Sequence, residues 1–342
     1  MGRRVTWLVV GAVAAVAVAA TVEALLGEPE ARSTSSREPG ASATIDGGEG
    51  LRGVLYYTDP TCVLRGLRLP ELRPAPAPEW QECTFSLGPS ARDVGSAGSV
   101  WDPGAESSAS ESDGSVTASV FGTQSISFRG STPSYRRNGT LTFVRDGALR
   151  LLPLGSGCLR LREPVQSVRE DLIDRCSRVL LRPRDLRRLA LLHPSAQADP
   201  SLLRQVTVKA HAWLDDARLV LLVALDVLAA GRFEQVVVVG GRRAISVVPV
   251  SGGRLSALRA SPRGRYFAVR AEDPDAVLLF DRDGNALEHP SLTRAHALAW
   301  SPGERWTAVA TEDAVEIWRT TAPNLPVRHL GIRAGDLAWR LG

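Results

Sequence analysis

The sequence predicts an all-β fold built from a repeated antiparallel unit of four strands, and three observations support this prediction. Similar segments recur at intervals of roughly 40 to 45 residues, a spacing typical of propeller blades. These segments contain Ser-Pro and Asp-Gly turns between apolar strands, and both turn types favour tight connections. The two ends of the folded region also carry complementary parts of one unit. Together these features predict a β-propeller of about six four-stranded blades.

The clearest copies of the repeat are segments 255–281 and 295–319. In both, a short alternating strand leads into a Ser-Pro turn, and a second and a third strand follow. Because the interval between the copies around residues 131 and 213 is much longer than the others, we expect a degenerate unit inside it. The positions that correspond in successive copies are Phe85, Ser131, Trp213, Ala260, Trp300 and Trp339.

Tryptophan and proline recur at fixed places in the repeat, and we expect both to be structural. Trp213, Trp300 and Trp339 lie in the first strand of their units, where a large aromatic side chain can fill the space between blades. Pro262 and Pro302 follow a serine in the turn after that strand. Proline presets the backbone at the first corner of such a turn.

One blade is expected to be assembled from both ends of the chain. Segment 336–340 matches the first strand of the repeat, and the other three strands do not follow it. Segments 52–57 and 62–69 match the second and third strands and lack a first. Placed side by side, they complete one blade with the C-terminal strand innermost. This pairing would remove sheet edges that an open ring exposes.

Two stretches interrupt the strand pattern. Segment 105–115 is rich in Ser, Glu and Asp, and we expect a solvated loop there. Segment 164–193 changes period and predicts a helical insertion with two short helices, 164–174 and 183–193, each with proline near its start. The second helix has leucines on one face and arginines on the other. Its candidate partner surface consists of Arg184, Arg187 and Arg188, with a merely solvated helix face as the alternative.

The N-terminus predicts a membrane anchor. Arg3 and Arg4 precede the uncharged apolar segment 5–22, which would span about 27 Å as a helix. The predicted order is a cytoplasmic tip at 1–4, a transmembrane anchor at 5–26, a flexible linker at 27–50 and the propeller domain at 51–342. The arginines favour a cytoplasmic N-terminus, so the domain would lie on the extracytoplasmic side of the cell membrane. A cleaved signal peptide is the alternative, because small residues at 18–20 suit a peptidase.

The four cysteines agree with an exported domain. Cys62, Cys83, Cys158 and Cys176 all follow the apolar segment and form two pairs that are close in sequence. The sequence has no Cys-x-x-Cys motif, the spacing that would suggest a zinc site or thiol exchange. We expect disulfides Cys62–Cys83 and Cys158–Cys176, while the other two pairings and four buried thiols remain open.

Composition narrows the class of protein without selecting an activity. Hydrophobic residues make up 44% of the chain and charged residues 23%, which excludes disorder throughout, collagen, a coiled coil and a multi-span membrane protein. The net charge is +4, and Lys209 is the single lysine among 41 basic residues. The basic residues are not gathered on one segment, so we expect no nucleic-acid partner.

The sequence predicts no catalytic residue, no metal and no cofactor. The sequence lacks a nucleophile elbow, a His-Glu-x-x-His zinc motif, a phosphate-binding loop and a dinucleotide fingerprint. The Asp-rich segment 281–285 resembles the start of a calcium loop. Leu292, however, stands where such a loop needs a bidentate glutamate, so we expect a hairpin turn.

The Ala-Trp-Ser-Pro-x-x-Arg pattern, with Val-Glu-Ile-Trp after it, resembles the repeats of bacterial exported WD40-like propellers of the Tol-associated type. The resemblance is good over about 205–340, fair over 51–90 and 125–155, and absent over 160–200. It departs from eukaryotic WD40 repeats, because no Gly-His and Trp-Asp pair occurs at the expected offsets. It implies the fold and, by analogy alone, a role in binding envelope components.

Two functions follow from these observations. The first is a non-catalytic, monomeric, membrane-tethered propeller that binds a protein or cell-envelope partner. The alternative is a propeller-type enzyme or a small-ligand sensor with its site at the centre of the ring. That site would need acids or histidines on several innermost strands, whereas segments 255–260 and 295–301 offer only Arg259 and His296.

Overall fold

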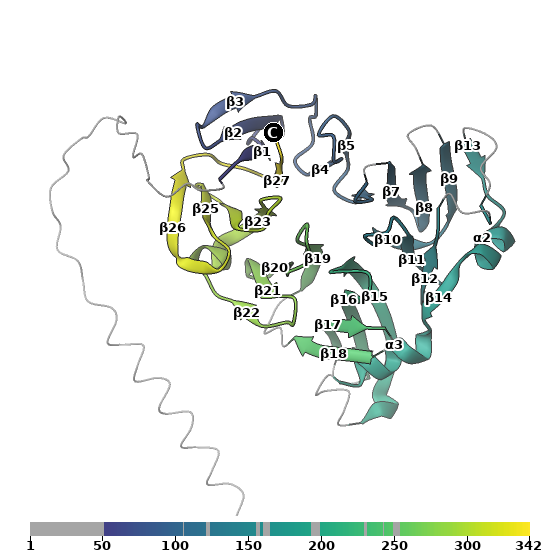
Figure 1. Cartoon of the computed structure of the whole chain (residues 1–342). Helices are drawn as coiled ribbons and strands as arrows, with labels where there is room; N and C mark the ends of the chain where they lie inside the picture. The colour runs from purple at the N-terminus through teal and green to yellow at the C-terminus, as the bar shows by residue number, and fades with distance from the viewer. Residues whose placement is uncertain are drawn as a thin grey trace, which may run out of the picture. The chain divides into compact units, whose positions relative to one another are not determined.

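The computed structural model describes residues 51–104, 106–120, 124–154, 158–159, 165–192, 199–228, 231–241, 243–248 and 254–342 (Figure 1). The expected cytoplasmic tip, anchor and linker, residues 1–50, lie outside the described residues. Within the described part, no helix is both long enough and apolar enough to cross a bilayer. The described residues all belong to one compact unit.

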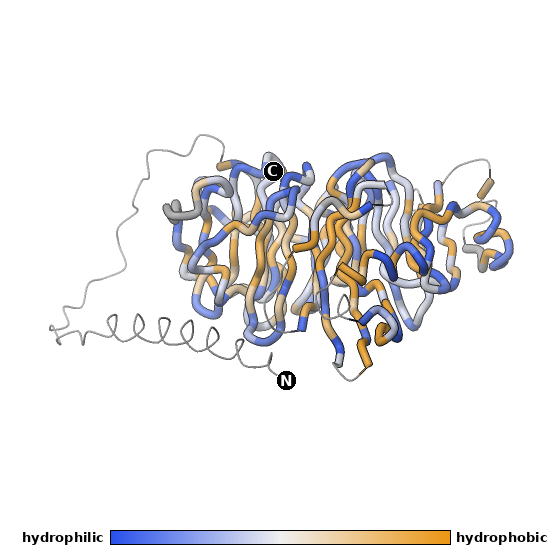
Figure 2. The backbone as a smooth tube through the Cα atoms, turned by 90° about the horizontal axis from the view of Figure 1, so that it is seen from below, coloured by the Kyte–Doolittle hydropathy of each residue, from blue (hydrophilic) through white to orange (hydrophobic). Residues whose placement is uncertain are grey.

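The described part of this unit is all-β apart from two short helices and two 3₁₀ turns. Its described strands form six sheets of four or five strands and one two-stranded hairpin, arranged around a common centre in Figure 1. The expectation of an all-β propeller with about six blades is therefore confirmed. Figure 2 shows hydrophobic strands through the middle of the unit and more hydrophilic connections at both ends.

We number the six larger sheets as blades along the chain, starting with the sheet that contains β1. Blade 1 combines both ends of the chain, and the β4–β5 hairpin lies between blades 1 and 2. The strands of each blade are as follows: blade 1, β27 (Leu337–Arg340), β1 (Gly53–Thr58), β2 (Leu64–Leu69) and β3 (Arg73–Ala75); the hairpin, β4 (Ser86–Leu87) and β5 (Val94–Gly95); blade 2, β6 (Val100–Trp101), β7 (Ser107–Ser112), β8 (Ser115–Val120), β9 (Gln124–Arg129) and β13 (Val165–Ser167); blade 3, β10 (Ser131–Tyr135), β11 (Leu141–Arg145), β12 (Ala148–Leu152) and β14 (Arg178–Leu181).

The remaining blades are four-stranded antiparallel sheets. Their strands, with the helical elements, are as follows: blade 4, β15 (Leu203–Trp213), β16 (Arg218–Val227), β17 (Gly231–Gly240) and β18 (Arg243–Val248); blade 5, β19 (Leu255–Ala260), β20 (Tyr266–Glu272), β21 (Asp275–Asp281) and β22 (Ala286–Leu287); blade 6, β23 (Ala295–Trp300), β24 (Trp306–Thr311), β25 (Val315–Arg319) and β26 (Ala322–Leu330); helices α2 (Glu170–Cys176) and α3 (Pro183–Ala190); 3₁₀ turns η2 (Pro200–Leu202) and η3 (Pro290–Arg294).

Blade 1 joins the two ends of the chain, as the sequence predicts. The C-terminal strand β27 pairs antiparallel with β1, so that Trp339 lies opposite Leu55 and Ala338 opposite Tyr56. The sheet order β27-β1-β2-β3 places the C-terminal strand at the edge nearest the centre of the ring. Blade 1 thereby acquires a first strand that the N-terminal segment alone cannot provide.

The expected loop at 105–115 is wrong. Residues 107–112 and 115–120 are the strands β7 and β8, joined by a tight turn at Asp113 and Gly114, both of which have positive φ angles. Ala109, Val116 and Ala118 are fully buried in the interface with blade 3. Small side chains let these strands pack closely, whereas composition alone makes the same segment look solvated.

The degenerate unit expected before Trp213 is also wrong for the described residues. After β12 the chain passes to the outer edge of blade 2, where β13 pairs in parallel with β9. It then forms α2 and returns as β14, the fourth strand of blade 3. The helical insertion is present, but α2 and α3 are shorter than predicted and β14 lies between them.

Candidate functional site

The serine of each Ser-Pro turn forms hydrogen bonds that stabilise the turn after the first strand of its blade. In blades 5 and 6 the hydroxyl of Ser261 or Ser301 accepts a hydrogen bond from the backbone N–H five residues later, at 3.0 and 3.1 Å. Pro262 and Pro302 occupy the next position in the turn. Each serine also exchanges main-chain hydrogen bonds with its blade, so the motif closes the link from the first strand to the second.

The three repeating tryptophans lie between blades. Trp213 packs with residues of blades 3 and 4, and the guanidinium of Arg136 lies 4.7 Å from the centre of its ring. Trp300 packs between blades 5 and 6. Trp339 packs between blades 6 and 1, and its indole N–H donates to the carbonyl of Arg52 at 3.1 Å. All three tryptophans pack in the interior and none is exposed, which indicates a structural role.

A buried polar network joins blades 3 and 4. The hydroxyl of Thr142 donates to the Ser134 carbonyl at 2.9 Å, so its oxygen must accept from both Trp213 Nε1, at 3.1 Å, and His211 Nε2, at 2.7 Å. The proton of His211 is thereby assigned to Nε2, and Nδ1 is buried without a partner. Burial lowers the pKa of His211 from 6.5 to about 3, which keeps the ring neutral.

At the centre of the ring, Asp336 ties three parts of the chain together. Its carboxylate accepts from both terminal nitrogens of Arg259 in blade 5, at 3.2 and 3.3 Å, and from the backbone N–H of Phe85, at 3.2 Å. The Asp336 side chain is 6% exposed, whereas that of Arg259 is 44% exposed. This ion pair therefore connects the start of β27 with blade 5 and with the segment that leads into β4.

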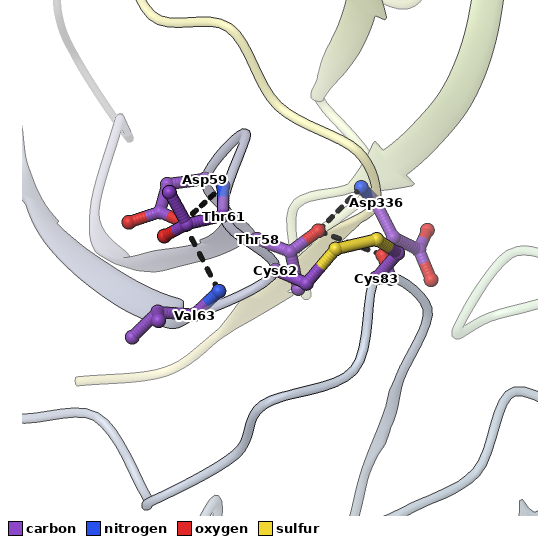
Figure 3. Close-up of a disulfide and its surroundings, with 7 residues drawn as sticks. All are labelled: Thr58, Asp59, Thr61, Cys62, Val63, Cys83 and Asp336. Carbon is purple, nitrogen blue, oxygen red and sulfur yellow. Dashed lines mark hydrogen bonds between the residues drawn. A yellow bond between two sulfur atoms is a disulfide. The ribbon is translucent and has the colours of Figure 1, made fainter.

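The Cys62–Cys83 disulfide lies beside this joint (Figure 3). The backbone N–H of Asp336 donates to the Thr58 hydroxyl at 3.0 Å, and that hydroxyl donates to the Cys83 carbonyl at 2.8 Å. The expected pairings Cys62–Cys83 and Cys158–Cys176 are both confirmed, with Cα–Cα distances of 4.2 and 5.7 Å. The first disulfide fastens the segment before β4 to blade 1.

Asp59 shapes the turn that presents Cys62. Its carboxylate accepts from the hydroxyl and backbone N–H of Thr61, at 2.6 and 2.9 Å, and from the N–H of Val63, at 3.0 Å (Figure 3). The hydrogen bond from the Thr61 hydroxyl is the main reason why the pKa of Asp59 falls to about 2. The ordered turn places Cys62 at a φ of 63°, beside its partner.

The polar residues that the sequence places near the centre of the ring have structural partners. Arg259 pairs with Asp336, and His296 donates its Nε2–H to the carbonyl of Ala334 at 2.6 Å. Both contacts hold the segment that enters β27. Within the described part of the chain, no three His, Cys, Asp or Glu side chains gather closely enough to hold a metal ion.

The arginines of α3 divide into two groups. Arg187 donates to the carbonyl of Leu203 at 2.6 Å and so anchors the helix to β15. Arg184 and Arg188 are exposed, and Arg184 approaches Asp185 only to 4.0 Å. The opposite face buries Leu186 and Leu189 against blades 3 and 4. The helix therefore packs at the edge of the ring with two arginines free to meet solvent.

A concave surface lies where blade 1 faces the β4–β5 hairpin. We call it the hairpin groove, a space of about 460 Å³. The hairpin covers the inner part of blade 1, where Val54, Tyr56 and Leu64 pack with Phe85 and Leu87. The hairpin has only two strands, whereas the blades have four or five. The lining residues are Val54, Tyr56, Arg68, Ala75, Pro76, Ala77, Pro78, Ser90, Ala91, Arg92, Leu341 and Gly342.

No family model matches this sequence, and no curated protein matches it either. Among solved structures, TolB from Acinetobacter baumannii is similar at a TM-score of 0.41 and 14% identity, covering 85% of this chain and 67% of that one. The Dos1 propeller has a TM-score of 0.41 at 11% identity, with 82% and 73% covered. The Cps50 (Swd1) β-propeller domain from Myceliophteria thermophila has a TM-score of 0.38 at 15% identity, with 70% and 88% covered. The propeller architecture described above follows from this chain's own sheets.

Sequence reasoning missed the hairpin groove. The copy of the repeat around Phe85 was expected to be a further unit, but only its first turn and two very short strands form. A signal was present, because segment 74–78 alternates proline and alanine, and proline cannot continue a sheet ladder. That signal marks the end of blade 1 but does not reveal what lies opposite.

Proposed function

We propose that this protein is a membrane-tethered, extracytoplasmic β-propeller that binds a protein partner in the hairpin groove. The single observation that carries this proposal is the incomplete sheet between blades 1 and 2. A two-stranded hairpin occupies a place that four strands fill elsewhere in the ring, and it leaves a groove of about 460 Å³. A concave surface of this size, with apolar walls and a few polar groups, is typical of a binding site.

The acidic and basic side chains near the centre of the ring form structural contacts, which favours binding over catalysis. Asp336 and Arg259 form an ion pair, and His296 bonds to a main-chain carbonyl. A general base must reach a substrate proton with a free lone pair. These groups instead form hydrogen bonds that hold strand β27 in place, which supports a scaffold role.

Two features support the proposed location. Arg3 and Arg4 stand before the apolar segment 5–22, an order that favours a cytoplasmic N-terminus and an exported domain. All four cysteines are paired, and such bonds persist in oxidising compartments outside the cytoplasm.

Reporter fusions test the orientation. A reporter enzyme that is active only in the cytoplasm, fused after Gly342 of the full chain, should be silent. A second reporter that is active only outside the cytoplasm should give signal at the same position. The reverse pattern would show that the domain lies inside the cell, and the proposed location would then be abandoned.

Site-directed photo-cross-linking tests the binding site. A photoreactive amino acid replaces Ala77, a groove-lining residue, in the full-length protein in its native cells. We expect one discrete adduct, which should disappear when Ser90→Trp fills the groove. The same probe at Arg204, an exposed residue of blade 4, should not give that adduct. An adduct that forms equally from both positions, or that survives Ser90→Trp, would contradict the assignment of the groove.

A further inference from the structure

Three arginines share one row across blade 1. Val54 of β1 lies opposite Arg340 of β27 on one side and opposite Arg68 of β2 on the other. Arg68 in turn lies opposite Arg73 of β3. Residues directly opposite one another in an antiparallel sheet project from the same face. The row Arg340, Val54, Arg68 and Arg73 therefore runs from the centre of the ring to its outer edge on a single face of the blade.

That face is the one that borders the hairpin groove. Arg340, at the inner end of the row, donates to the carbonyl of Leu87 in β4, which places the hairpin over this part of the face. Arg68 lines the groove farther out, and both Arg68 and Arg73 are exposed. Arg92, in the turn of the hairpin, lines the same groove. The row thus passes from beneath the hairpin into the open groove.

No Asp or Glu side chain of the described residues pairs with the outer arginines. Among the described residues, no ion pair or side-chain hydrogen bond engages Arg68, Arg73 or the guanidinium of Arg92. The groove lining contains no Asp or Glu side chain, and the nearby Asp93 accepts from the Ser90 hydroxyl at 2.9 Å. Like charges that lie directly opposite in a sheet are unfavourable. The positive charges of Arg68 and Arg73 therefore do not stabilise the fold.

Blade 3 contains two neighbouring arginines with a structural role, and both form ion pairs with acidic side chains. Arg145 and Arg150 lie on neighbouring strands, and Asp174 of α2 accepts from both, at 3.2 and 3.0 Å. Glu170 also pairs with Arg145. Arginines near one another are thus neutralised by acids where their role is structural. The row on blade 1 has no such ion pair among the residues that the structure describes, which indicates that its counter-charge comes from another molecule.

The rest of the groove suits a peptide chain. Ala75, Pro76, Ala77 and Pro78 form an apolar wall next to the Tyr56 ring. Burial raises the pKa of Tyr56, and the charges of Arg68 and Arg340 act in the opposite direction, so the phenol stays a neutral hydrogen-bond group. From β27 to β3 the row spans three strand spacings, about 14 Å, which roughly four residues of extended chain can cover. A bilayer surface is flat and could not enter a space walled on two sides.

We propose that the hairpin groove binds an extended, acidic peptide segment of the partner protein. Its carboxylates would meet Arg68, Arg73 and Arg92, and its apolar side chains would lie against Tyr56 and the alanine–proline wall. Side chains at alternate positions of an extended chain lie about 7 Å apart on one face, so successive acids can reach successive arginines. This inference rests on the proposed function, because it names the chemistry of the partner at the same groove.

The test uses the purified full-length protein in detergent and a fluorescein-labelled decapeptide of alternating alanine and glutamate. Anisotropy should report binding, and the matched alanine–glutamine peptide should bind at least about tenfold more weakly. The double variant Arg68→Gln with Arg73→Gln should lose at least about tenfold in affinity for the acidic peptide. The control double variant, Arg204→Gln with Arg232→Gln, removes the same charge from exposed positions of blade 4 and should bind like the unmodified protein.

The outcomes separate this inference from the proposed function. Equal binding of both peptides, lost in Ser90→Trp, would keep the groove as a protein-binding site and overturn its preference for acids. An equal loss in the two double variants would show unspecific charge attraction and would also overturn the inference. Binding to vesicles of anionic phospholipid that depends on Arg68 and Arg73, without peptide binding, would assign the row to a membrane instead.

Discussion

At the scale of single residues, buried polar side chains between blades depend on specific hydrogen bonds, because no other partner is available to them. His211 is the clearest case, because its ring must stay neutral to remain buried beside Thr142 and Trp213. Protonation would place a proton on Nδ1, which is buried and has no hydrogen-bond partner, and would leave a charge on the buried ring. The cost of that charge appears as a pKa of about 3 in the folded protein, compared with 6.5 ordinarily.

We expect this histidine to make the folded domain sensitive to acid. Between pH 6.5 and about 3 the unfolded chain binds a proton at His211 that the folded chain does not bind, so stability falls as the pH falls below 6.5. The slope from one such group is at most about 1.4 kcal/mol per pH unit. Urea unfolding at pH 7 and pH 5 should show a smaller pH effect for His211→Gln than for the unmodified protein.

A matched control is available in blade 6. His329 is exposed, with its ring 66% accessible, so His329→Gln should leave most of the acid sensitivity in place. If His211→Gln were as sensitive to pH as the unmodified protein, His211 would not be the group responsible.

At the scale of a single element, the turn after the first strand decides how closely neighbouring blades approach. In blade 5 this turn ends at Gly264, with a φ of 64°. A Cβ atom there would lie 1.6 Å from the carbonyl oxygen of Leu214 in blade 4, a backbone atom that cannot move aside. In the corresponding turn of blade 6, Glu304 occupies this position and also adopts a positive φ, of 60°.

We therefore expect Gly264→Ala to destabilise the domain strongly. The left-handed conformation alone costs about 1–2 kcal/mol for a residue with a side chain, and the overlap with Leu214 adds to this. Gly303→Ala, in the equivalent turn of blade 6, is the control, because no atom lies within 4 Å of its added Cβ. Chemical denaturation should show a loss of at least about 2 kcal/mol for the first variant and less than about 0.5 kcal/mol for the second. Equal stabilities would mean that the two blades can move apart.

At the scale of the whole molecule, the ring depends on a short C-terminal strand. Strand β27 carries Trp339, which packs between blades 6 and 1, and it follows Asp336, which pairs with Arg259 of blade 5. Its loss would leave the edge of β1 unpaired and the carbonyl of Arg52 without the Trp339 indole. A strand of four residues thus connects blades that are far apart in sequence.

We expect deletion of residues 336–342 to lower the melting temperature of the domain markedly, since it removes a buried tryptophan and a full strand ladder. Deletion of Leu341 and Gly342 alone should change it little, because both lie beyond the strand and Leu341 is 78% exposed. Differential scanning calorimetry of the two truncated proteins compares them directly. An unchanged melting temperature after the longer deletion would show that blade 1 does not need its first strand.

Much of this architecture could be predicted because it depends on local chemistry. Ser-Pro turns mark the link between first and second strands, since the serine hydroxyl bonds within its own turn. The cysteines pair with their neighbours in sequence, where the connecting loops are short. The matching of the two termini follows from which strand types are missing at each end, and the pairing of β27 with β1 confirms it.

The rest was decided by tertiary structure, because it depends on what lies opposite a segment and not on the segment itself. Residues 107–120 have the composition of a loop, yet they become strands because small side chains fit against blade 3. The parallel strand β13 exists only because the edge of β9 is available to it. The arginines at 68, 73 and 340 are scattered in the sequence, and only the register of four strands brings them into one row. Local turn and strand signals therefore determined the repeat, whereas pairing between distant strands determined the groove and its charge.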